Sequence, residues 1–358
     1  MTLFTVTTQM FRTHLLELHE IRSIIASSLG LKDLASCARV SQDWNDSFTP
    51  PLYKSVVLSK NGPSLESVEK NKYLIHRLVI LEAAYEKLLS ASARDKVISS
   101  VMANSILTTL DLSFNSIEDD EIQALSEALK ANSTLTTLNL HSNAIGSNGA
   151  QVLSEALKTN STLTTLNLNS NPIGDNGVVA LSEALKTNST LTTLDLFGSR
   201  IGDNGVVALS EALKTNSPLT TLGLGGNSIG STGVQALAEA LNTNSTLTTL
   251  NLYGSSIGDN EAKTLFEALK TNLTLITLNL SHNSIGSNGA QVLSEALRTN
   301  STLTTLDLQY NSIGPNGAQA LSKVLKTNST LTTLDLWGSW IGDDGAVALS
   351  EALKTNST

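Results

Sequence analysis

Several features that would narrow the class of this 358-residue chain are scarce or missing. Cysteine occurs once, at Cys37, so no internal disulfide can form and a small disulfide-stabilised secreted scaffold is excluded. No apolar run approaches the roughly 18 residues that a membrane span needs. The N-terminus lacks the basic and apolar segments of a signal peptide. We therefore predict a cytoplasmic protein, with the nucleus as the alternative, and no membrane partner.

Positive charge is also scarce over most of the chain. Residues 107–358 carry 11 Lys and Arg against 22 Asp and Glu, whereas residues 1–106 carry 12 against 10. Binding to a phosphate backbone needs clustered Lys and Arg. Nucleic acid is therefore not an expected partner.

Motifs for catalysis are missing as well. No GxxxxGK[ST] phosphate-binding loop is present, and the glycine-rich stretch GLGGNSIG at 223–230 has no nucleotide-binding βαβ context. His141 and His282 are too far apart to share a metal ion or a catalytic triad. Cys37 lies on an apolar helix face and is most simply a core residue. We expect a non-catalytic protein without cofactor or metal.

The chain instead contains a 28-residue unit that occurs nine times from Leu107 to Thr358 without insertion or deletion. Each unit is close to LTTLxLxxNxIGxxGxxxLSEALKTNST. A fixed period of this length indicates a solenoid, because each unit can bury its apolar face only against its neighbours. The units begin at Leu107, Leu135, Leu163, Leu191, Leu219, Leu247, Leu275, Leu303 and Leu331.

The first half of each unit predicts a short strand followed by a turn. Alternation along a strand places every second side chain on the same face, so the leucines of LTTLxL point into the core. In the unit that begins at Leu135, the amide of Asn143 is expected to satisfy backbone groups in the turn between repeats. The expected core residues here are Leu135, Leu138, Leu140 and Ile145.

The second half of each unit predicts a helix. Ser147, or Asp at the same position of other units, is expected to cap the helix N-terminus. Glu155 and Lys158 are expected on the outer face, with Lys158 near the helix C-terminus. Apolar residues at helical spacing predict the buried face, formed by Ala150, Leu153, Ala156 and Leu157.

The pattern LxxLxLxxNxI within 28 residues resembles the leucine-rich repeats of the ribonuclease-inhibitor-like subclass. That subclass includes Ran GTPase-activating proteins and the sensor ends of NOD-like receptors. The resemblance covers residues 107–358 and implies an α/β horseshoe with a parallel sheet inside and helices outside. It says little about function.

The two ends of the repeat array differ. Residues 75–106 resemble a degenerate capping repeat, with a strand in HRLVILEA and a helix from Leu88 to Val101. The last unit has no atypical polar repeat after it, so Leu349, Ala352 and Leu353 are expected to border an open end. We expect either a longer array or a partner that covers this end.

The first 58 residues break the repeat pattern and predict three short helices followed by a strand in LYKSVVLS. Glu20-Ile21, the LKDL at 31–34 and the VSxxW at 40–44 resemble an F-box-like domain. The pattern departs from that family at His19, where proline is usual after the leading leucine. The alternative is a helical cap that only shields the first repeat.

The F-box resemblance implies a Skp-type adaptor as partner of residues 13–58. The apolar contacts carried over by position are Leu18, Ile21, Leu34 and Val40. We therefore divide the chain into an F-box-like helical domain (1–58), a polar linker (59–74), the degenerate capping repeat (75–106) and nine repeats (107–358).

Aromatic residues are few, and within the array they gather just after the strands. A solenoid core does not need them there, and exposed aromatics supply much of the binding energy at protein interfaces. We predict a partner-binding rim along the concave face. The alternative is an aromatic-Gly-Ser variant of the turn, in which the ring fills the space left when Asn becomes Ser. The predicted binding residues are Phe114, Phe197, Tyr253, Tyr310, Trp337 and Trp340.

Two further sets of charged residues belong to this surface. Asp307 and Asp335, with Asp111 and Asp195, occupy the fifth position of their units and could meet a basic partner; alternatively they are solvated or bridged by threonine hydroxyls. Arg200 is the only Arg of the strand-to-helix rim, where it could act on a small GTPase or simply be a solvated surface charge.

These features predict a protein-binding module. The preferred hypothesis is an F-box-like substrate receptor that holds its partner on the concave repeat face for ubiquitin ligation. The alternatives are a regulator of a Ran-type small GTPase and a plain leucine-rich-repeat scaffold or sensor.

Overall fold

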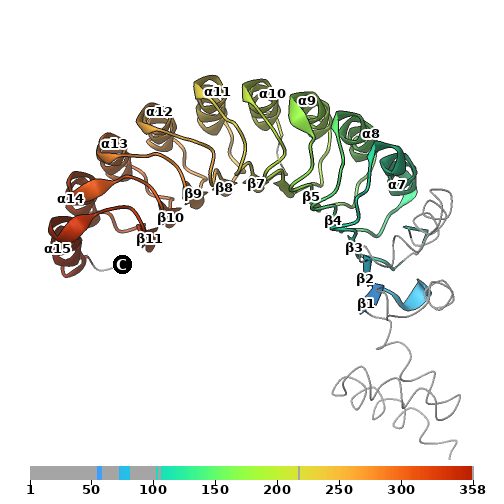
Figure 1. The fold of residues 1–358 in the computed structure, drawn as a ribbon, viewed down its shortest axis with the longest axis horizontal. Helices are drawn as coiled ribbons and strands as arrows, with labels where there is room; N and C mark the ends of the chain where they lie inside the picture. The colour runs from blue at the N-terminus through green and yellow to red at the C-terminus, as the bar shows by residue number, and fades with distance from the viewer. Residues whose placement is uncertain (1–54, 59–71, 81–101, 104–105, 217, 357–358) are drawn as a thin grey trace, which may run out of the picture.

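Figure 1 shows the computed structural model, an arc of parallel strands backed by helices. It describes residues 55–58, 72–80, 102–103, 106–216 and 218–356. Leu18, Ile21, Leu34, Val40 and the three predicted N-terminal helices lie outside these residues, as does the helix predicted from Leu88 to Val101.

The described elements alternate between strand and helix along the array. Before it lie β1 (Ser55–Leu58), the 3-10 helix η1 (Lys72–Leu74) and β2 (Arg77–Ile80). The array itself contains β3 (Thr109–Asp111), α7 (Asp119–Ala131), β4 (Thr137–Asn139), α8 (Ser147–Leu157), β5 (Thr165–Asn167), α9 (Gly174–Leu185), β6 (Thr193–Asp195), α10 (Asp203–Leu213), β7 (Thr221–Gly223), α11 (Ser231–Leu241), β8 (Thr249–Asn251), α12 (Asp259–Leu269), β9 (Thr277–Asn279), α13 (Ser287–Leu297), β10 (Thr305–Asp307), α14 (Gly314–Leu325), β11 (Thr333–Asp335) and α15 (Gly342–Leu353).

One parallel sheet of eleven strands runs in sequence order from β1 to β11. Within the array the register is one repeat per strand, so that Leu138 pairs with Leu166. The predicted strand in LYKSVVLS is confirmed at β1, which joins this sheet through the pair Val56–Leu78. The strand predicted in HRLVILEA is confirmed at β2. The predicted α/β horseshoe is therefore the observed fold of the described residues, with the sheet inside and the helices outside (Figure 1).

The predicted core positions are buried. Leu135, Leu138, Leu140 and Ile145 from the strand half are completely shielded from solvent, and Ala150, Leu153, Ala156 and Leu157 from the helix half are shielded to within 1 %. The same positions of the other internal repeats join them in one continuous core along the arc. Because each repeat shares its core with both neighbours, the repeats stabilise one another rather than folding alone.

Asparagine side chains tie the turns of neighbouring repeats together, as predicted for Asn143. Its Nδ2 donates to the carbonyls of Leu112 (3.0 Å) and Leu140 (2.8 Å). Its Oδ1 accepts from the backbone N–H groups of Asn115 and Ile117, both at 3.0 Å. One side chain thus satisfies four backbone groups that would otherwise be buried without partners.

A second asparagine column follows the helices. Asn160 donates through Nδ2 to the carbonyl of Leu129 (2.9 Å) and accepts at Oδ1 from the N–H of Leu163 (2.8 Å). Asn160 begins an Asn-Ser-Thr triplet, the acceptor motif of N-glycosylation, and its side chain is 5 % exposed. Its amide nitrogen is therefore engaged inside the folded array and is not free for modification.

The predicted helix cap was wrong. In α8 the N-cap residue is Gly146, and Ser147 is the first helical residue without a side-chain capping bond. Where aspartate occupies this position it acts across repeats: Asp175 Oδ1 accepts from the N–H of Gly202, the N-cap residue of α10, at 2.7 Å. The short polar side chain therefore caps the next helix of the stack, which the sequence of one unit cannot reveal.

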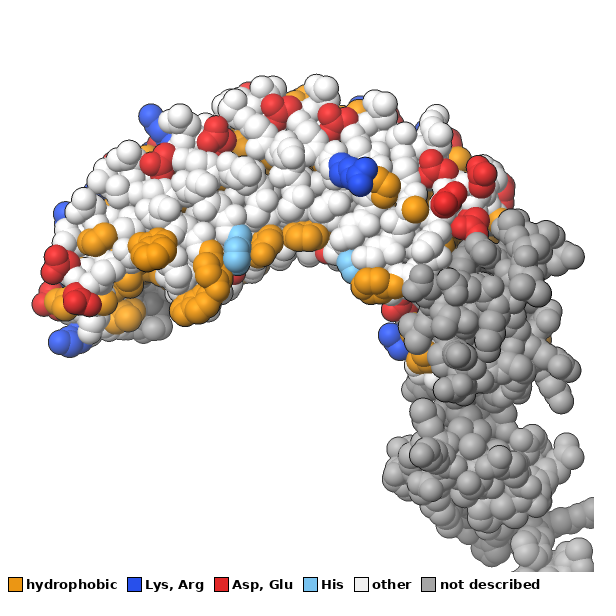
Figure 2. All heavy atoms as spheres, in the orientation of Figure 1, with side chains coloured by type: hydrophobic (Ala, Val, Ile, Leu, Met, Phe, Trp, Pro, Cys, Tyr) orange, Lys and Arg blue, Asp and Glu red, His pale blue; other side chains and the backbone are white. Residues whose placement is uncertain are grey.

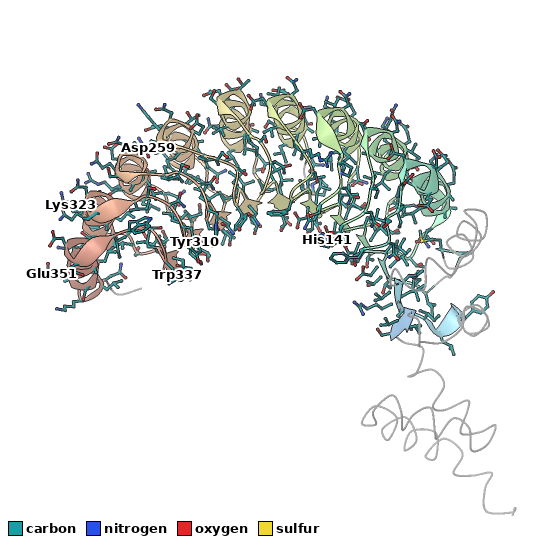
Figure 3. All side chains as sticks on the ribbon, in the orientation of Figure 1. His141, Asp259, Tyr310, Lys323, Trp337 and Glu351 are labelled. Carbon is teal, nitrogen blue, oxygen red and sulfur yellow. The ribbon has the colours of Figure 1, made fainter. Side chains whose placement is uncertain are left out.

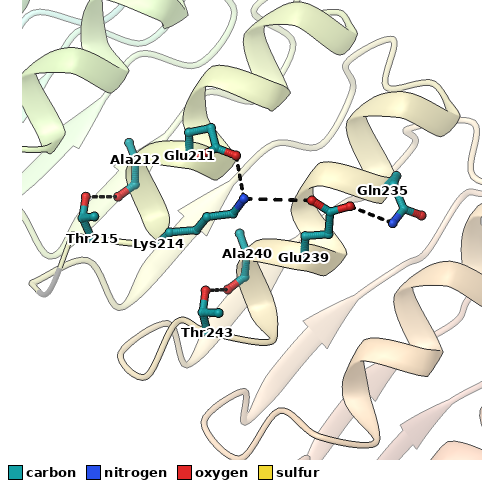
Figure 4. Close-up of polar contacts among 8 residues, drawn as sticks. All are labelled: Glu211, Ala212, Lys214, Thr215, Gln235, Glu239, Ala240 and Thr243. Carbon is teal, nitrogen blue, oxygen red and sulfur yellow. Dashed lines mark hydrogen bonds and ion pairs between the residues drawn. The ribbon is translucent and has the colours of Figure 1, made fainter.

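The outer faces of the helices carry the predicted charged pairs. Lys158 bonds Glu155 at 2.6 Å, and the pattern recurs in neighbouring helices. In Figure 4, Lys214 of the α10 end contacts Glu211 at 2.6 Å and reaches Glu239 of α11 at 3.9 Å. The hydrogen bond from Lys214 to Glu211, with the nearby charges of Glu211 and Glu239 and against partial desolvation, raises the pKa of Lys214 above its ordinary value.

The last described repeat is less covered than the others. Leu349 is half-buried and Ala352 is buried, whereas the side chains of Val347 and Leu353 are 59 % and 63 % exposed. The corresponding leucines of internal repeats, such as Leu157, are buried, because another helix packs over them. Among the helices of the described residues, none has the length and apolar character to cross a membrane.

Candidate protein-binding site on the concave rim

In every repeat, the eighth residue lies in the turn after the strand and has a left-handed backbone conformation. The backbone φ at this position lies between 50° and 70° throughout. Glycine adopts this conformation without strain, whereas a bulky residue there costs about 1–3 kcal/mol. Three bulky residues nevertheless occupy it: Phe114 (58°), His282 (56°) and Tyr310 (50°). The turn therefore projects their rings from the rim at a conformational cost.

Most of the rim aromatics form one line of rings, which we call the aromatic ladder: Phe197, Tyr253, His282, Tyr310 and Trp337. Successive ring centroids are 5.7, 4.7, 4.2 and 4.6 Å apart. The Tyr310 and Trp337 rings meet edge to face at 88°, a favoured geometry for aromatic pairs. The ladder crosses the repeats from the one that begins at Leu191 to the one that begins at Leu331.

The repeat that begins at Leu219 supplies no ring to the aromatic ladder, and two glycines there leave room for the ring of Phe197. A Cβ on Gly225 would lie 2.9 Å from Cδ2 of Phe197, and a Cβ on Gly226 would lie 3.0 Å from its Cζ. The Phe197 ring therefore lies against this Gly-Gly turn and reaches Tyr253 two repeats away. The stretch GLGGNSIG, which has no nucleotide-binding context in the sequence, provides the space for this contact.

The C-terminal end of the ladder is the most exposed. Tyr310 is 42 % exposed, Trp337 64 % and Trp340 82 %. Tyr310, Gly338 and Trp340, with Asn311 and Ser312, line a shallow groove of about 320 Å³. In Figure 2 the hydrophobic side chains and a histidine follow the inner edge of the arc, and Figure 3 places Tyr310 and Trp337 on that edge.

Phe114 lies apart from the ladder, although the sequence groups it with the other rim aromatics. Its ring meets His141 edge to face at 4.8 Å and 90°. Figure 3 places His141 on the opposite limb of the arc from Trp337. The concave rim thus carries two aromatic groups, and the ladder is the larger.

The aspartates of the fifth position start the turns that hold the rings. Asp335 Oδ1 accepts from the N–H of Trp337 at 3.0 Å, and its Oδ2 accepts from Nε2 of Gln309 at 2.6 Å. Asp307 accepts from the N–H of Gln309 at 2.9 Å. Threonine hydroxyls, which were the alternative partners expected for these aspartates, donate instead to backbone carbonyls of the preceding repeat, as Thr332 does to Thr304.

In aromatic-Gly-Ser turns, serine stands where other repeats have the turn asparagine, and its hydroxyl can make some of the same hydrogen bonds. Ser339 Oγ donates to the carbonyl of Leu308 at 2.7 Å and accepts from the N–H of Asn311 at 3.2 Å. Ser199, Ser255 and Ser339 are each buried to 1 % exposure or less. The hydroxyls of Ser199 and Ser339 thus make part of the inter-repeat bonding, while the adjacent rings contact one another along the rim.

Two ladder features escaped the sequence reasoning. His282 bridges Tyr253 and Tyr310, and the Gly225-Gly226 pair opens the path for Phe197. The 28-residue spacing does place His282 and Tyr310 in the same repeat position, so aligning the repeats could have found the histidine. The contact across two repeats could not be found this way, because it depends on the lateral direction of the Phe197 ring.

Other chemistry at the rim is limited. Arg200 is exposed, with a left-handed φ of 59° that Ser256 and Trp340 share at the same repeat position. Within the described part of the chain, no three His, Cys, Asp or Glu side chains come close enough to hold a metal ion. The surface offers rings, carboxylates and amides for binding a partner.

A solenoid with an exposed aromatic concave rim defines a repeat scaffold of the kind that binds other proteins. A family model described as Leucine Rich repeat matches eight segments, which together span more than half of the chain: residues 103–126, 131–154, 159–182, 187–210, 215–238, 271–294, 299–322 and 327–350. The chain belongs to the leucine-rich repeat family. The unit from Leu247, between the fifth and sixth segments, also contributes β8 and α12 in the same register.

Three solved structures are similar to this chain at low sequence identity. The tropomodulin C-terminal domain of Caenorhabditis elegans is 19 % identical, with 42 % of this chain and 92 % of that chain covered and a TM-score of 0.37. Leiomodin-1 actin-binding site 2 is 23 % identical, with 51 % and 88 % covered and a TM-score of 0.34. One chain of the yeast Rad7–Elc1 complex is 14 % identical, with 94 % of this chain and 94 % of that chain covered and a TM-score of 0.45. A search of curated proteins gave no match.

Proposed function

We propose that this chain is a non-catalytic receptor whose concave rim binds a protein partner through the aromatic ladder and Trp340. The observation that carries the proposal is a line of contacting rings with its exposed end at Tyr310 and Trp337. Large exposed aromatics contribute disproportionately to protein–protein affinity. Holding Tyr310 in a left-handed conformation has a conformational cost that a core role does not explain.

The repeats themselves supply well-matched variants to test this site. Trp337→Ser and Tyr310→Ser introduce residues that other repeats already carry at these positions, at Ser281 and Ser142. The control is Leu273→Ser, since Leu273 is 66 % exposed and stands where other repeats have serine, on the opposite side of the strands. We expect the double variant to weaken partner binding about 100-fold. Unchanged affinity in a folded double variant would refute the site.

We further propose that residues 13–58 dock on a Skp-type adaptor, so that the bound partner is presented for ubiquitin ligation. This part rests on the F-box-like pattern, with Leu18, Ile21, Leu34 and Val40 as the contacts. Co-expression of the full chain with a Skp-type adaptor is expected to yield a stable complex that Ile21→Arg disrupts. A folded chain that never co-purifies with the adaptor would contradict this part and leave the concave-face proposal standing.

The second candidate is regulation of a Ran-type small GTPase. It is favoured by Arg200, which is exposed at the strand-end rim and forms no ion pair within the described residues. Arg200→Ser reproduces Ser256 at the equivalent position, and Arg298→Lys on the α13 end is the control. If this candidate is right, the full chain accelerates GTP hydrolysis by a Ran-type GTPase. Arg200→Ser abolishes the acceleration, and Arg298→Lys does not. If the chain neither binds a Skp-type adaptor nor stimulates a GTPase, the remaining hypothesis is a plain leucine-rich-repeat scaffold or sensor.

A further inference from the structure

The charges of the concave surface are paired less often than those of the outer helices. From the first to the tenth position of every repeat, which includes the strand and the strand-end turn, the array has four aspartates and a single Lys or Arg, Arg200. The rest of the array is acidic too, with 18 Asp and Glu against 10 Lys and Arg, but its helices pair several glutamates with lysines three residues later, as in Glu155–Lys158. The negative charge of the concave face is therefore left for a partner to neutralise.

This imbalance is strongest at the exposed end of the ladder. Asp307 and Asp335 are register partners on adjacent strands. Like charges opposite each other in a sheet are unfavourable. The side-chain and backbone groups that bond them are neutral: the N–H of Gln309 on Asp307, and the N–H of Trp337 with Nε2 of Gln309 on Asp335. A cation placed near this pair would remove the repulsion.

The rings next to the two aspartates suit a cation as well. The side chains of Tyr310 and Trp337 are 42 % and 64 % exposed, so part of their surface is open to a partner, and Trp340 extends the apolar groove beside Tyr310. An Arg or Lys group over a Trp or Tyr face is stabilised by cation–π attraction, and arginine can stack its guanidinium plane on the ring. Rings and carboxylates together favour a partner side chain with an apolar stem and a positive end.

The ladder also sets the length of the partner segment. It crosses six repeats, and its four successive centroid distances limit its length to about 19 Å. An extended peptide advances about 3.3 Å per residue, so roughly six residues would span it. Alternate side chains of such a segment point the same way, which allows several cations to face the rim.

Resting on the proposed function, we infer that the concave rim recognises an extended segment of a partner protein rich in Arg or Lys, with its cations at Asp307 and Asp335 and over Tyr310 and Trp337. Asp195, beside Phe197, provides a further carboxylate near the other end of the ladder. The acidic array attracts such a segment over long range, since clustered charge of one sign raises the association rate of an oppositely charged partner.

The test measures the affinity of the full chain for labelled probe peptides by fluorescence anisotropy. The probes alternate Arg with Ser, Lys with Ser or Glu with Ser, and a polyproline peptide serves as an uncharged extended probe. The key variant is Asp307→Asn with Asp335→Asn. It keeps the turn, because Asn251 and Asn279 accept the same backbone bond at this position. The control is Glu295→Gln in α13 with Glu351→Gln in α15, which removes the same charge from the outer helices; Figure 3 labels Glu351.

The Arg-Ser peptide is expected to bind most tightly, and the Asp variant to weaken it about tenfold while the control stays within about twofold. Added salt should weaken binding to the wild type more than to the Asp variant. Absence of Arg-Ser binding, equal binding of the Glu-Ser or polyproline probe, or an equal loss in the control would overturn the inference.

A protein partner distinguishes this inference from the proposed function. If Trp337→Ser with Tyr310→Ser abolishes binding of that partner and the Asp variant does not, the concave site stands and its cationic selectivity fails. If neither variant changes the affinity, the proposed function itself fails.

Discussion

At the scale of single residues, asparagine is the main link between repeats. Asn227 donates to the carbonyls of Leu196 and Leu224 and accepts from the N–H groups of Ser199 and Ile201, at 2.8–3.0 Å. The strands from β3 to β11 are only three residues long, so the turns beyond them contain many backbone groups without sheet partners. The asparagine amide has two N–H donors on Nδ2 and two lone pairs on Oδ1, so one side chain can satisfy four of these groups.

Asn227→Ala is therefore expected to lower the free energy of unfolding by about 3–5 kcal/mol, because four buried backbone groups lose their partner. Urea denaturation would measure the change. Asn227→Ser, which reproduces Ser199 and Ser339, should lose less, since a hydroxyl keeps part of the bonding. An equal loss for both variants would show that packing, and not hydrogen bonding, sets the cost.

Replacing one buried serine by alanine is expected to stabilise the folded chain. The hydroxyl of Ser210 in α10 is buried and has no hydrogen-bond partner in the described structure, and the next repeat has Ala238 at this position. Ser210→Ala is expected to raise the free energy of unfolding by about 1 kcal/mol, because an unpaired polar group leaves the core. The matched control is Ser182→Ala, which removes a hydroxyl that bonds Val178 at 2.7 Å and should not stabilise.

At the scale of helices and strands, neighbouring elements complete one another. Asp203 and Asp259 accept from the N–H groups of Gly230 and Gly286 in the following repeats, both at 2.7 Å, and thereby satisfy the N-termini of α11 and α13. The helix ends exchange ionic contacts too, as Lys214 does with Glu239. The stability of a helix here depends partly on the identity of its neighbour.

The Lys214 contact predicts a pH dependence. The pKa of Lys214 is raised above 10.5 in the folded chain, so its stabilisation is fully present below that pH and is lost as the pH rises through the raised value. Lys214→Gln should therefore lower the urea midpoint slightly near neutral pH, and the difference should vanish in strong alkali. Lys354→Gln, at an exposed lysine without an ion pair in the described residues, should show no such dependence. A difference that persists in alkali would contradict the ion-pair origin.

At the scale of the whole molecule, the array behaves as a one-dimensional stack. Internal helices such as α11 pack against a helix on each side, whereas α15 packs against α14 on one side. Each repeat therefore gains stability from two interfaces, except at the end of the described array. The same curvature that stacks the helices outside brings the strand-end turns together inside, which is how rings from different repeats meet.

We expect amide hydrogen exchange to be fastest in α15 and slowest in the central helices, because α15 opens without breaking a second interface. Exchange measured by mass spectrometry after peptic digestion would resolve this gradient. Leu353 and Val347, which are exposed, mark the region of weakest protection. Equal protection in α15 and α11 would indicate that the array unfolds as a single unit.

The repeat pattern alone was sufficient for the fold and the core. Leucine spacing in LTTLxL and the apolar face of the helix half correctly predicted Leu138, Ile145 and Leu153 as buried, because both periodicities are local. The inter-repeat role of Asn143 also followed from its place in the turn. The rim aromatics could be named as candidates, because they are large rings at turn positions where a solenoid core does not need them.

The tertiary structure decided what these local patterns could not. The partner of Asp175 is a glycine of the next repeat, so a residue expected to cap its own helix acts on a neighbour. The ring of Phe197 lies over Gly225 and Gly226 and joins Tyr253, His282 and Tyr310, while Phe114 stays with His141. Sequence determined each repeat through local periodicity. The stacking of repeats determined which side chains meet, because ring contacts and shared bonds depend on the lateral distance between strands.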